Sequence, residues 1–277
     1  MGARLARWLV AAPPSIFLLV FFLAPSLIMV GASLRHPGEF GGLAPLLAHE
    51  SAAGEPGLTL GAYAFLFGDW IYLWICLKSF VVAAVTTAAC LLLAYPLALL
   101  IALSPGKRRD LLVLLVILPF ASNFLVRIYA WMIVLGPLEL LYTQTAVLIA
   151  MVYVHLPFMI LPLYINLEKH DPVLLDAAQD LGANRWQRFW RITFPLSLPG
   201  IFAGAALVFI PVLGMFAIPE LLGGTRDILI GNLIKEQFLD NRDWPLGSAL
   251  SLVLTVMVLA LAWAALRLAR TSMRGIA

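Results

Sequence analysis

The chain has 277 residues, of which 62% are hydrophobic and 12% are charged. A soluble globular protein carries about 25% charged residues, because they cover the surface that faces water. The 18 Lys and Arg and 15 Asp and Glu of this chain cannot cover such a surface. The composition therefore excludes a soluble enzyme, a disordered tail and a secreted disulfide scaffold. It predicts an all-α integral membrane protein.

Six stretches are long and apolar enough to cross a membrane, since a spanning helix needs roughly 20 mostly apolar residues. In chain order they are 9–34, 75–104, 111–137, 142–167, 196–220 and 245–267. We expect them to form one transmembrane domain over 1–277. The first stretch follows Arg4 and Arg7, as in a signal peptide, but it is too long for one and more spans follow it.

The Lys and Arg residues are divided unevenly between the two sets of connections. With Arg267 counted after the sixth span and Lys78 before the second, the segment before the first span and those after the second, fourth and sixth spans hold twelve of them. The opposite connections hold five. Cytoplasmic loops of membrane proteins are enriched in these residues. We therefore interpret the net charge of +3 as a mark of cytoplasmic loops and not as a sign of nucleic-acid binding. Both termini and the loop 168–195 are therefore expected in the cytoplasm.

The loop 168–195 contains the start and stop signals of a short helix. Asp171 can cap free N–H groups, and Pro172 suits a first helical turn. We expect a helix over 173–181, ended by Gly182. Its Leu and Ala side chains need another protein to bury them in a loop that faces water. A plain connector between two spans is the alternative.

A second short helix is expected after Gly182. Its aromatic residues share one helical face and two arginines lie beside them: Trp186, Phe189, Trp190, Arg185 and Arg188. This pattern is typical of an amphipathic helix that lies on anionic head groups. Pro195 and Pro199 are expected to end this helix and to open the fifth span.

The run DAAQDLGANRWQRFWRITFP, Asp176–Pro195, resembles the EAA loop of ABC-importer permeases. The shared pattern is an acidic residue, Ala-Ala, three residues, Gly, nine residues and Ile-x-Leu-Pro. Asp176 replaces the usual Glu, and Phe194 replaces the usual Leu. The resemblance implies a type I importer permease fold in which the short helix is a coupling helix that lies in a groove of a cytoplasmic ATPase. The residues that would carry closure of the ATPase into the membrane are Asp176, Ala177, Ala178 and Gly182.

The energy source is expected on other chains. The phosphate-binding pattern GxxxxGK[ST] is absent, and the near match at Pro105–Arg108 lacks its first Gly and its Ser or Thr. No cofactor is expected in this chain, because ATP and Mg²⁺ would be bound by the ATPase. The partners implied are a second permease subunit, two cytoplasmic ABC ATPase subunits, and a periplasmic or lipid-anchored substrate-binding protein. The location implied is a bacterial inner membrane, with lipid around the spans.

Three further stretches resemble permeases of the spermidine/putrescine type: Tyr95–Ala98, Leu118–Gly136 and Ile210–Leu250. The similarity covers roughly 58–267. Lys78 departs from it, since Asn is expected at this position. The resemblance implies a polyamine as cargo. The alternatives are another organic cation, an opine, a phosphonate or ferric ion carried by the same machinery.

The substrate path is expected where polar groups and broken helix occur at membrane depth, because irregular backbone is tolerated there only against protein or a watery cavity. The fifth span contains Pro211, Gly214 and Pro219. A polyamine needs carboxylates and aromatic faces along its route. The residues that fit are Tyr129, Trp131, Glu220, Asp243 and Trp244. For Glu220 and Asp243, the alternative is that they are ordinary solvated charges at the outer interface.

Two polar residues within spans are expected to be structural. Arg127 would repel a cation and is expected to tie helices together, with a place in the path as the alternative. His155 is expected to be hydrogen-bonded in the core rather than to bind a metal or relay protons. An ion-driven secondary transporter would need such relays. A membrane anchor without transport activity would leave the broken fifth span unexplained.

Overall fold

The computed structural model describes residues 11–44, 57–225 and 227–274, and within these ranges the fold is all-helical apart from two isolated β-bridges. The chain divides into two compact units. The first unit contains 1–74 and 233–257, and the second contains 75–232 and 258–277. Each unit is considered by itself. Arg4 and Arg7, which contribute to the expected orientation, lie outside the described residues.

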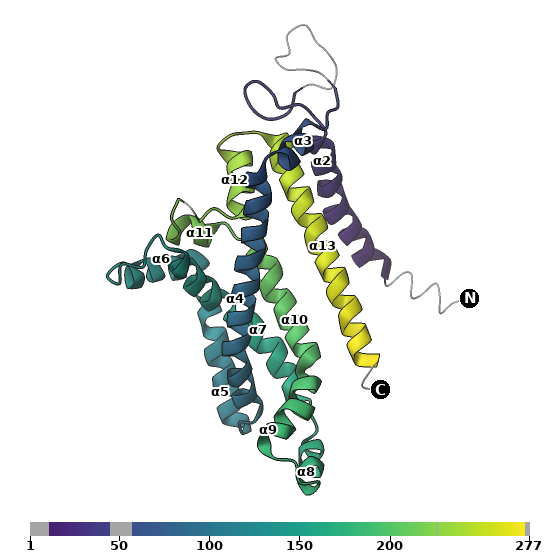
Figure 1. Ribbon diagram of the computed structural model, residues 1–277, viewed down its shortest axis with the longest axis vertical. Coiled ribbons are helices and arrows are strands. Elements are labelled where there is room, and N and C mark those ends of the chain that lie inside the picture. The colour runs from purple at the N-terminus through teal and green to yellow at the C-terminus, as the bar shows by residue number, and fades with distance from the viewer. Residues whose placement is uncertain (1–10, 45–56, 226, 275–277) are drawn as a thin grey trace, which may run out of the picture. The chain divides into compact units, whose positions relative to one another are not determined.

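Figure 1 shows and labels the helices. In chain order the elements are the π-helix η1 (Leu19–Leu23), α2 (Ala24–Ser33), α3 (Gly61–Gly68), α4 (Trp70–Ala102), α5 (Gly106–Ile117), the 3₁₀-helix η2 (Leu118–Ala121), α6 (Phe124–Leu135), α7 (Gln144–Glu168), α8 (Pro172–Asp180), α9 (Arg185–Arg188), the π-helix η3 (Phe189–Thr193), α10 (Phe194–Leu213), α11 (Ala217–Leu222), α12 (Ile230–Leu239) and α13 (Trp244–Arg274).

Within the described residues, five helices are long and apolar enough to cross a membrane. They are Ala11–Ser33, Trp70–Ala102, Gln144–Glu168, Arg185–Leu213 and Trp244–Trp263. A bent pair of helices makes a sixth candidate if the pair is counted as one span. The expectation of an all-α membrane protein with six spans agrees with this range.

The third expected span, 111–137, is not one straight helix. It is covered by Gly106–Ala121 and Phe124–Leu135, which are bent by 93° relative to each other. Asn123 has an extended backbone, and its side chain accepts a hydrogen bond from the N–H of Leu125 over 2.8 Å. It therefore starts α6 as a new helix. Apolar periodicity hides such a break, because both helices are hydrophobic.

The expectation that Pro195 and Pro199 end the second cytoplasmic helix is wrong. Helix runs without interruption over Arg185–Leu213 and includes both prolines. Just before Pro195, the chain forms the π-helical turn η3, in which the N–H of Phe194 reaches the carbonyl of Phe189. The wider turn shifts the carbonyls away from the α-helical register, so the proline ring is accommodated.

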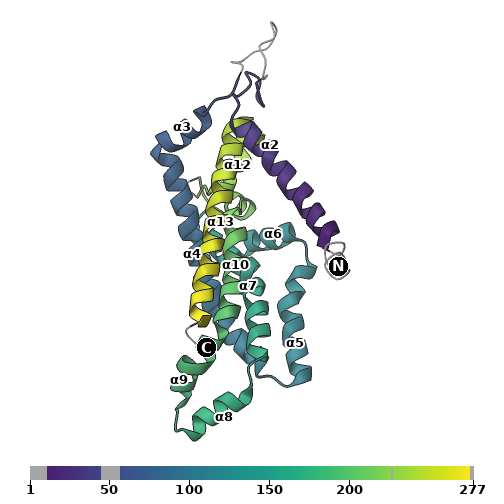
Figure 2. The same ribbon diagram turned by 90° about the vertical axis from the view of Figure 1, so that its right-hand side faces the viewer.

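The core of the second unit is the contact between α7 and α10. Two glycines of α10 allow the backbones to approach closely. A Cβ added at Gly200 would lie 2.7 Å from Cβ of Asn166, and one at Gly204 would lie 2.7 Å from Sδ of Met159. Small residues at helix contacts are typical of membrane proteins, where packing holds helices together. Within this unit, α8 and α9 lie at the end farthest from α6, as Figures 1 and 2 show.

Candidate functional site

Helix α8 has a defined start and a defined end. The Asp171 carboxylate accepts a hydrogen bond from the N–H of Val173 over 3.0 Å. At the other end, the N–H of Gly182 donates to the carbonyl of Gln179, and the N–H of Ala183 donates to that of Ala178. This pair of bonds is a Schellman motif, which needs a left-handed residue. Gly182 fills that place with φ +82°.

One side of α8 leaves apolar side chains uncovered. Val173 is 64% exposed and Leu181, directly after the helix, is 89% exposed. Leu174 and Ala177 are also exposed, as are Asp176 and Gly182. Residues 173, 177 and 181 are spaced four apart, so they form one stripe on the helix. The stripe is a surface of the kind that another protein covers.

Helix α9 starts with a capping box and is joined to α8 by a side-chain hydrogen bond. Asn184 and Gln187 form a capping box: the Gln187 N–H donates to Oδ1 of Asn184, and the Asn184 N–H donates to Oε1 of Gln187. Nη1 of Arg188 donates to Oε1 of Gln179 over 2.7 Å. The two short helices are thus linked through side chains as well as through the chain.

An aromatic cluster connects this region with α4. Its members are Tyr95, Trp186, Phe189, Trp190 and Phe194. The rings of Tyr95 and Phe189 meet edge to face at 5.5 Å. Ser197 donates its only hydroxyl proton to the carbonyl of Phe194, so the Tyr95 hydroxyl donates to Ser197, over 3.1 Å. The expected amphipathic face is therefore partly a packing contact with a spanning helix.

A second candidate site is a pocket of about 620 Å³ at α11 and the loop that follows it. The residues that line it are Tyr142, Pro219, Glu220, Gly223, Gly224, Thr225, Asp227, Ile228 and Asn232. We call it the α11 pocket. Among the described lining residues, the two carboxylates are Glu220, which is exposed, and Asp227, whose side chain is only 14% exposed. Carboxylates beside an aromatic ring are suited to a cation.

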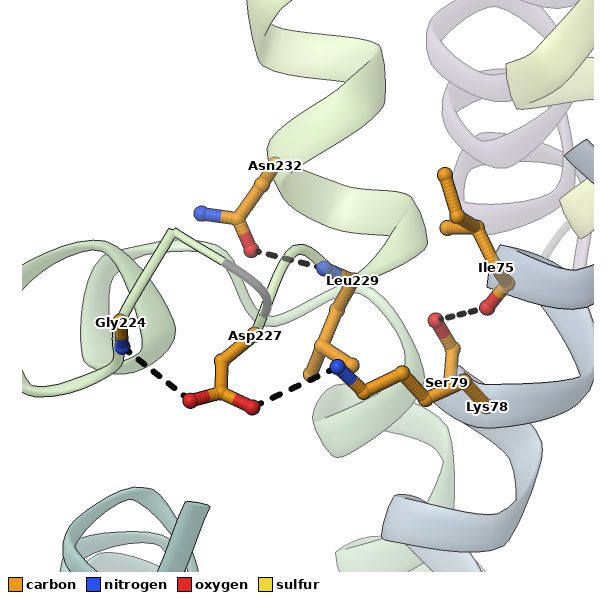
Figure 3. A network of polar contacts seen from close by, with 7 residues as sticks. All are labelled: Ile75, Lys78, Ser79, Gly224, Asp227, Leu229 and Asn232. Atoms are coloured by element: carbon orange, nitrogen blue, oxygen red, sulfur yellow. Dashed lines mark hydrogen bonds and ion pairs between the residues drawn. The ribbon is translucent and has the colours of Figure 1, made fainter. Parts of the chain in front are cut away.

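Asp227 is held from two sides, as Figure 3 shows. Its Oδ2 accepts a hydrogen bond from the N–H of Gly224 over 3.1 Å. Its Oδ1 lies 3.4 Å from Nζ of Lys78 on α4. The next residue of α4, Ser79, accepts a hydrogen bond from the N–H of Ile230 over 2.8 Å and donates to the carbonyl of Ile75. Two adjacent α4 residues thus contact the segment that leads into α12.

The expected path residues fall into both units. Tyr129 on α6 is exposed, and Trp131 meets Tyr153 edge to face at 5.4 Å. Glu220 lines the α11 pocket in the same unit. Asp243 and Trp244 belong to the other unit, where the Asp243 carboxylate accepts a hydrogen bond from the N–H of Leu246 and so caps α13. A path through all five residues stays a prediction.

The two polar residues expected to be structural have defined surroundings. The guanidinium of Arg127 lies over the rings of Phe120 and Phe124, at 5.7 and 6.0 Å from the ring centres. His155 is buried, and its Nδ1 is 2.8 Å from the carbonyl of Met151. A carbonyl only accepts, so Nδ1 carries the proton. His155 is hydrogen-bonded in the core, as expected.

The fold matches chains of solved ABC transporters. A chain of the bacterial alginate ABC transporter in complex with a periplasmic protein superposes with a TM-score of 0.68 at 18% identity, covering 95% of this chain and 94% of that one. A chain of the MetNI methionine ABC transporter in an inward-facing conformation superposes with a TM-score of 0.59, also at 18% identity, covering 74% of this chain and 99% of that one. The fold is therefore the one found in these ABC-transporter chains.

Sequence comparison gives the family. Residues 94–275 match the family of binding-protein-dependent transport system inner membrane components, and the chain belongs to it. It is 40% identical to the spermidine/putrescine transport system permease protein PotB of Escherichia coli K12, over 91% of this chain and 94% of that one. It is 44% identical to PotB of Haemophilus influenzae, over 73% of this chain and 76% of that one.

Asp227 and Tyr142 line the α11 pocket but were not among the expected path residues. Asp227 lies within the stretch Ile210–Leu250, but nothing local separates it from other loop carboxylates. Tyr142 lies in a different loop, where its N–H donates to the carbonyl of Leu222. One signal was available: a lysine at the start of a span needs an acidic or carbonyl partner. Lys78 has such a partner in Asp227.

Proposed function

We propose that this chain is one permease subunit of an ATP-driven importer for polyamines such as spermidine and putrescine. The support is its identity to PotB proteins of two bacteria over most of its length. A different cargo is named for a less similar protein. A molybdenum transport permease of Mycobacterium bovis is 30% identical over 65% of this chain.

The geometric observation that carries the proposal is the exposed stripe on α8. Asp176 and Ala177 lie on the exposed surface of this helix, and Gly182 lets the chain turn away directly after it. Ala178, which is partly covered, leaves room for close approach. We infer that α8 docks in a groove of a cytoplasmic ATPase. Such docking requires the loop 168–195 to lie on the cytoplasmic side, and we propose the same side for both termini, as the distribution of Lys and Arg indicates.

The aromatic cluster gives this docking a route into the membrane domain. Movement of α8 is passed to α9 through Arg188 and Gln179, and from Phe189 to α4 through Tyr95. Rings packed edge to face resist independent movement of their helices. The complete importer would contain this chain, a second permease, two ATPase subunits and an external binding protein.

The cargo would pass the α11 pocket. Glu220 offers a carboxylate there, and Tyr142 is an aromatic residue in the same lining. Tyr129 and Trp131 on α6, and Asp243 and Trp244 in the other unit, are proposed as further surfaces along the way. A polyamine has two or more ammonium groups, so more than one carboxylate is needed to pair its charges.

The test is uptake of labelled putrescine and spermidine in the source cell, with the gene deleted and then restored. Loss on deletion and recovery on restoration would support importer and cargo together. Unchanged uptake in a strain without other polyamine importers would contradict the cargo. Co-purification of an ATPase with the tagged chain tests the machinery separately, because a secondary transporter or a simple anchor has no need of one.

A further inference from the structure

The ion pair between Lys78 and Asp227 lies at the wall of the α11 pocket. Asp227 lines this pocket, and Lys78 approaches the same carboxylate from α4. The two residues are 149 positions apart in the chain. Both side chains are mostly buried, with 19% and 14% of their surfaces exposed. The pocket wall thus holds a partly desolvated carboxylate that already has a cation beside it.

The cation that Lys78 supplies is a primary ammonium at the end of four methylene groups. The ends of a linear polyamine are the same chemical group on the same kind of stem. The separation of 3.4 Å between Nζ and Oδ1 is longer than the 2.7–2.9 Å of a well-formed charged hydrogen bond. This contact is therefore weaker than a well-formed charged hydrogen bond, so a second ammonium can compete for the carboxylate.

We propose that Asp227 is the carboxylate that receives an alkylammonium group of the cargo, and that Lys78 occupies this carboxylate when the cargo is absent. This inference rests on the proposed function, since it specifies the group by which a cationic cargo is bound. In this arrangement Lys78 is a built-in competitor. It sets the concentration of cargo that the pocket needs.

The surrounding contacts allow such an exchange without loss of the loop. Removing the Lys78 cation from beside a mostly buried carboxylate is costly, but replacing it by another ammonium leaves the charge paired. The loop keeps its shape through bonds that do not involve Lys78: Gly224 and Asp227 are hydrogen-bonded to each other in both directions. Ser79 still contacts Ile230 when Lys78 leaves. Asp227 therefore stays in place while its partner changes.

The experiment measures binding of labelled n-butylamine to the purified, fully assembled transporter without its binding protein. This probe carries one ammonium on a four-carbon stem and tests the site independently of the natural cargo. Lys78→Met removes the competitor and keeps the stem, so the dissociation constant should fall by about five- to tenfold. Asp227→Asn removes the charge but keeps an oxygen for the Gly224 N–H, so binding should weaken by a similar factor. Lys78→Arg keeps a cation beside Asp227, so its dissociation constant should stay near that of the original chain.

The opposite signs of the two variants distinguish competition from a structural ion pair. If the pair only held the fold together, both variants would weaken binding or leave it unchanged, and either result would overturn the proposal. Arg109→Met is the matched control, because it breaks another ion pair, with Glu168, that contributes nothing to the pocket lining. If the dissociation constant of butylamine falls in Lys78→Met and rises in Asp227→Asn while cells take up no polyamine, the polyamine cargo is contradicted. In that case the ammonium site at Asp227 is still supported.

Discussion

Arg188 on α9 donates a hydrogen bond from Nη1 to Oε1 of Gln179 on α8, over 2.7 Å. The segment between these residues contains the left-handed Gly182 and the capping box of Asn184 and Gln187. The side-chain bond therefore closes a compact turn between two short helices. Since α9 continues through η3 into α10, the turn connects the exposed stripe of α8 with a spanning helix.

Arg188→Met should uncouple ATP hydrolysis from transport in part. The exposed bond contributes about 0.5–1.5 kcal/mol, so the turn is loosened rather than lost. We expect the complex to assemble and to hydrolyse more ATP for each molecule imported. The ratio of hydrolysis to uptake in proteoliposomes measures this. Arg185→Met on the same helix is the control, and an equal effect of both variants would remove the bond to Gln179 from the coupling route.

Gly182→Arg should abolish uptake while leaving part of the assembly intact. A Cβ at Gly182 meets open space, but φ of +82° strains any residue with a side chain, and a long one would also block docking. Gly182→Asn separates the two effects, because Asn tolerates this backbone conformation and is short. We expect the Asn variant to retain most of its uptake. Normal uptake in the Arg variant would contradict the docking of α8.

Tyr95→Phe and Tyr95→Ala should differ in their effects. Loss of the hydroxyl removes one hydrogen bond to Ser197, which contributes about 0.5–1.5 kcal/mol, and leaves the ring on Phe189. Loss of the ring removes the contact between α4 and the aromatic cluster. For each variant, thermal unfolding of the purified complex measures the loss of stability. The number of ATP molecules hydrolysed for each cargo molecule imported measures the loss of coupling. Equal behaviour of the two variants would show that the ring contact does not carry the coupling.

Glu220→Gln should weaken cation uptake and spare basal ATP hydrolysis. The change removes a negative charge from the lining of the α11 pocket and keeps the shape of the side chain. Transport of a labelled polyamine by the reconstituted complex, at saturating binding protein, measures it. Glu220→Asp keeps the negative charge at the same pocket and should retain more uptake than Glu220→Gln. Unchanged uptake in Glu220→Gln would take this carboxylate out of the path.

Asp243→Ala should reduce stability, because the Asp243 side chain caps α13. The cost of removing such a cap is about 1 kcal/mol. Asp243→Asn keeps an acceptor oxygen for the Leu246 N–H and should be stable. If the Asn variant folds normally but transports less polyamine, the carboxylate also serves the path. If it transports normally, Asp243 acts as a helix cap alone.

The parts of the fold that could be predicted are those that depend on neighbouring residues. Apolar length indicated the spans, and Asp171, Pro172 and Gly182 marked the ends of α8 within one turn on either side. The π-helical turn before Pro195 and the 93° bend at Asn123 were not predicted. Both features are local, but they depend on which backbone hydrogen bonds are formed. They were missed because hydrophobic periodicity does not indicate the backbone hydrogen-bond pattern.

The sequence by itself determined the class of the protein, because hydrophobic content and the spacing of the loop Asp176–Pro195 are read along the chain. Only the tertiary structure decided which distant groups meet. The contacts of Tyr95 with Phe189 and of Lys78 with Asp227 join residues far apart in sequence. Such pairs depend on how helices pack, and a lone lysine near a span predicts that a partner exists without naming it. The partner is Asp227, which lines the α11 pocket.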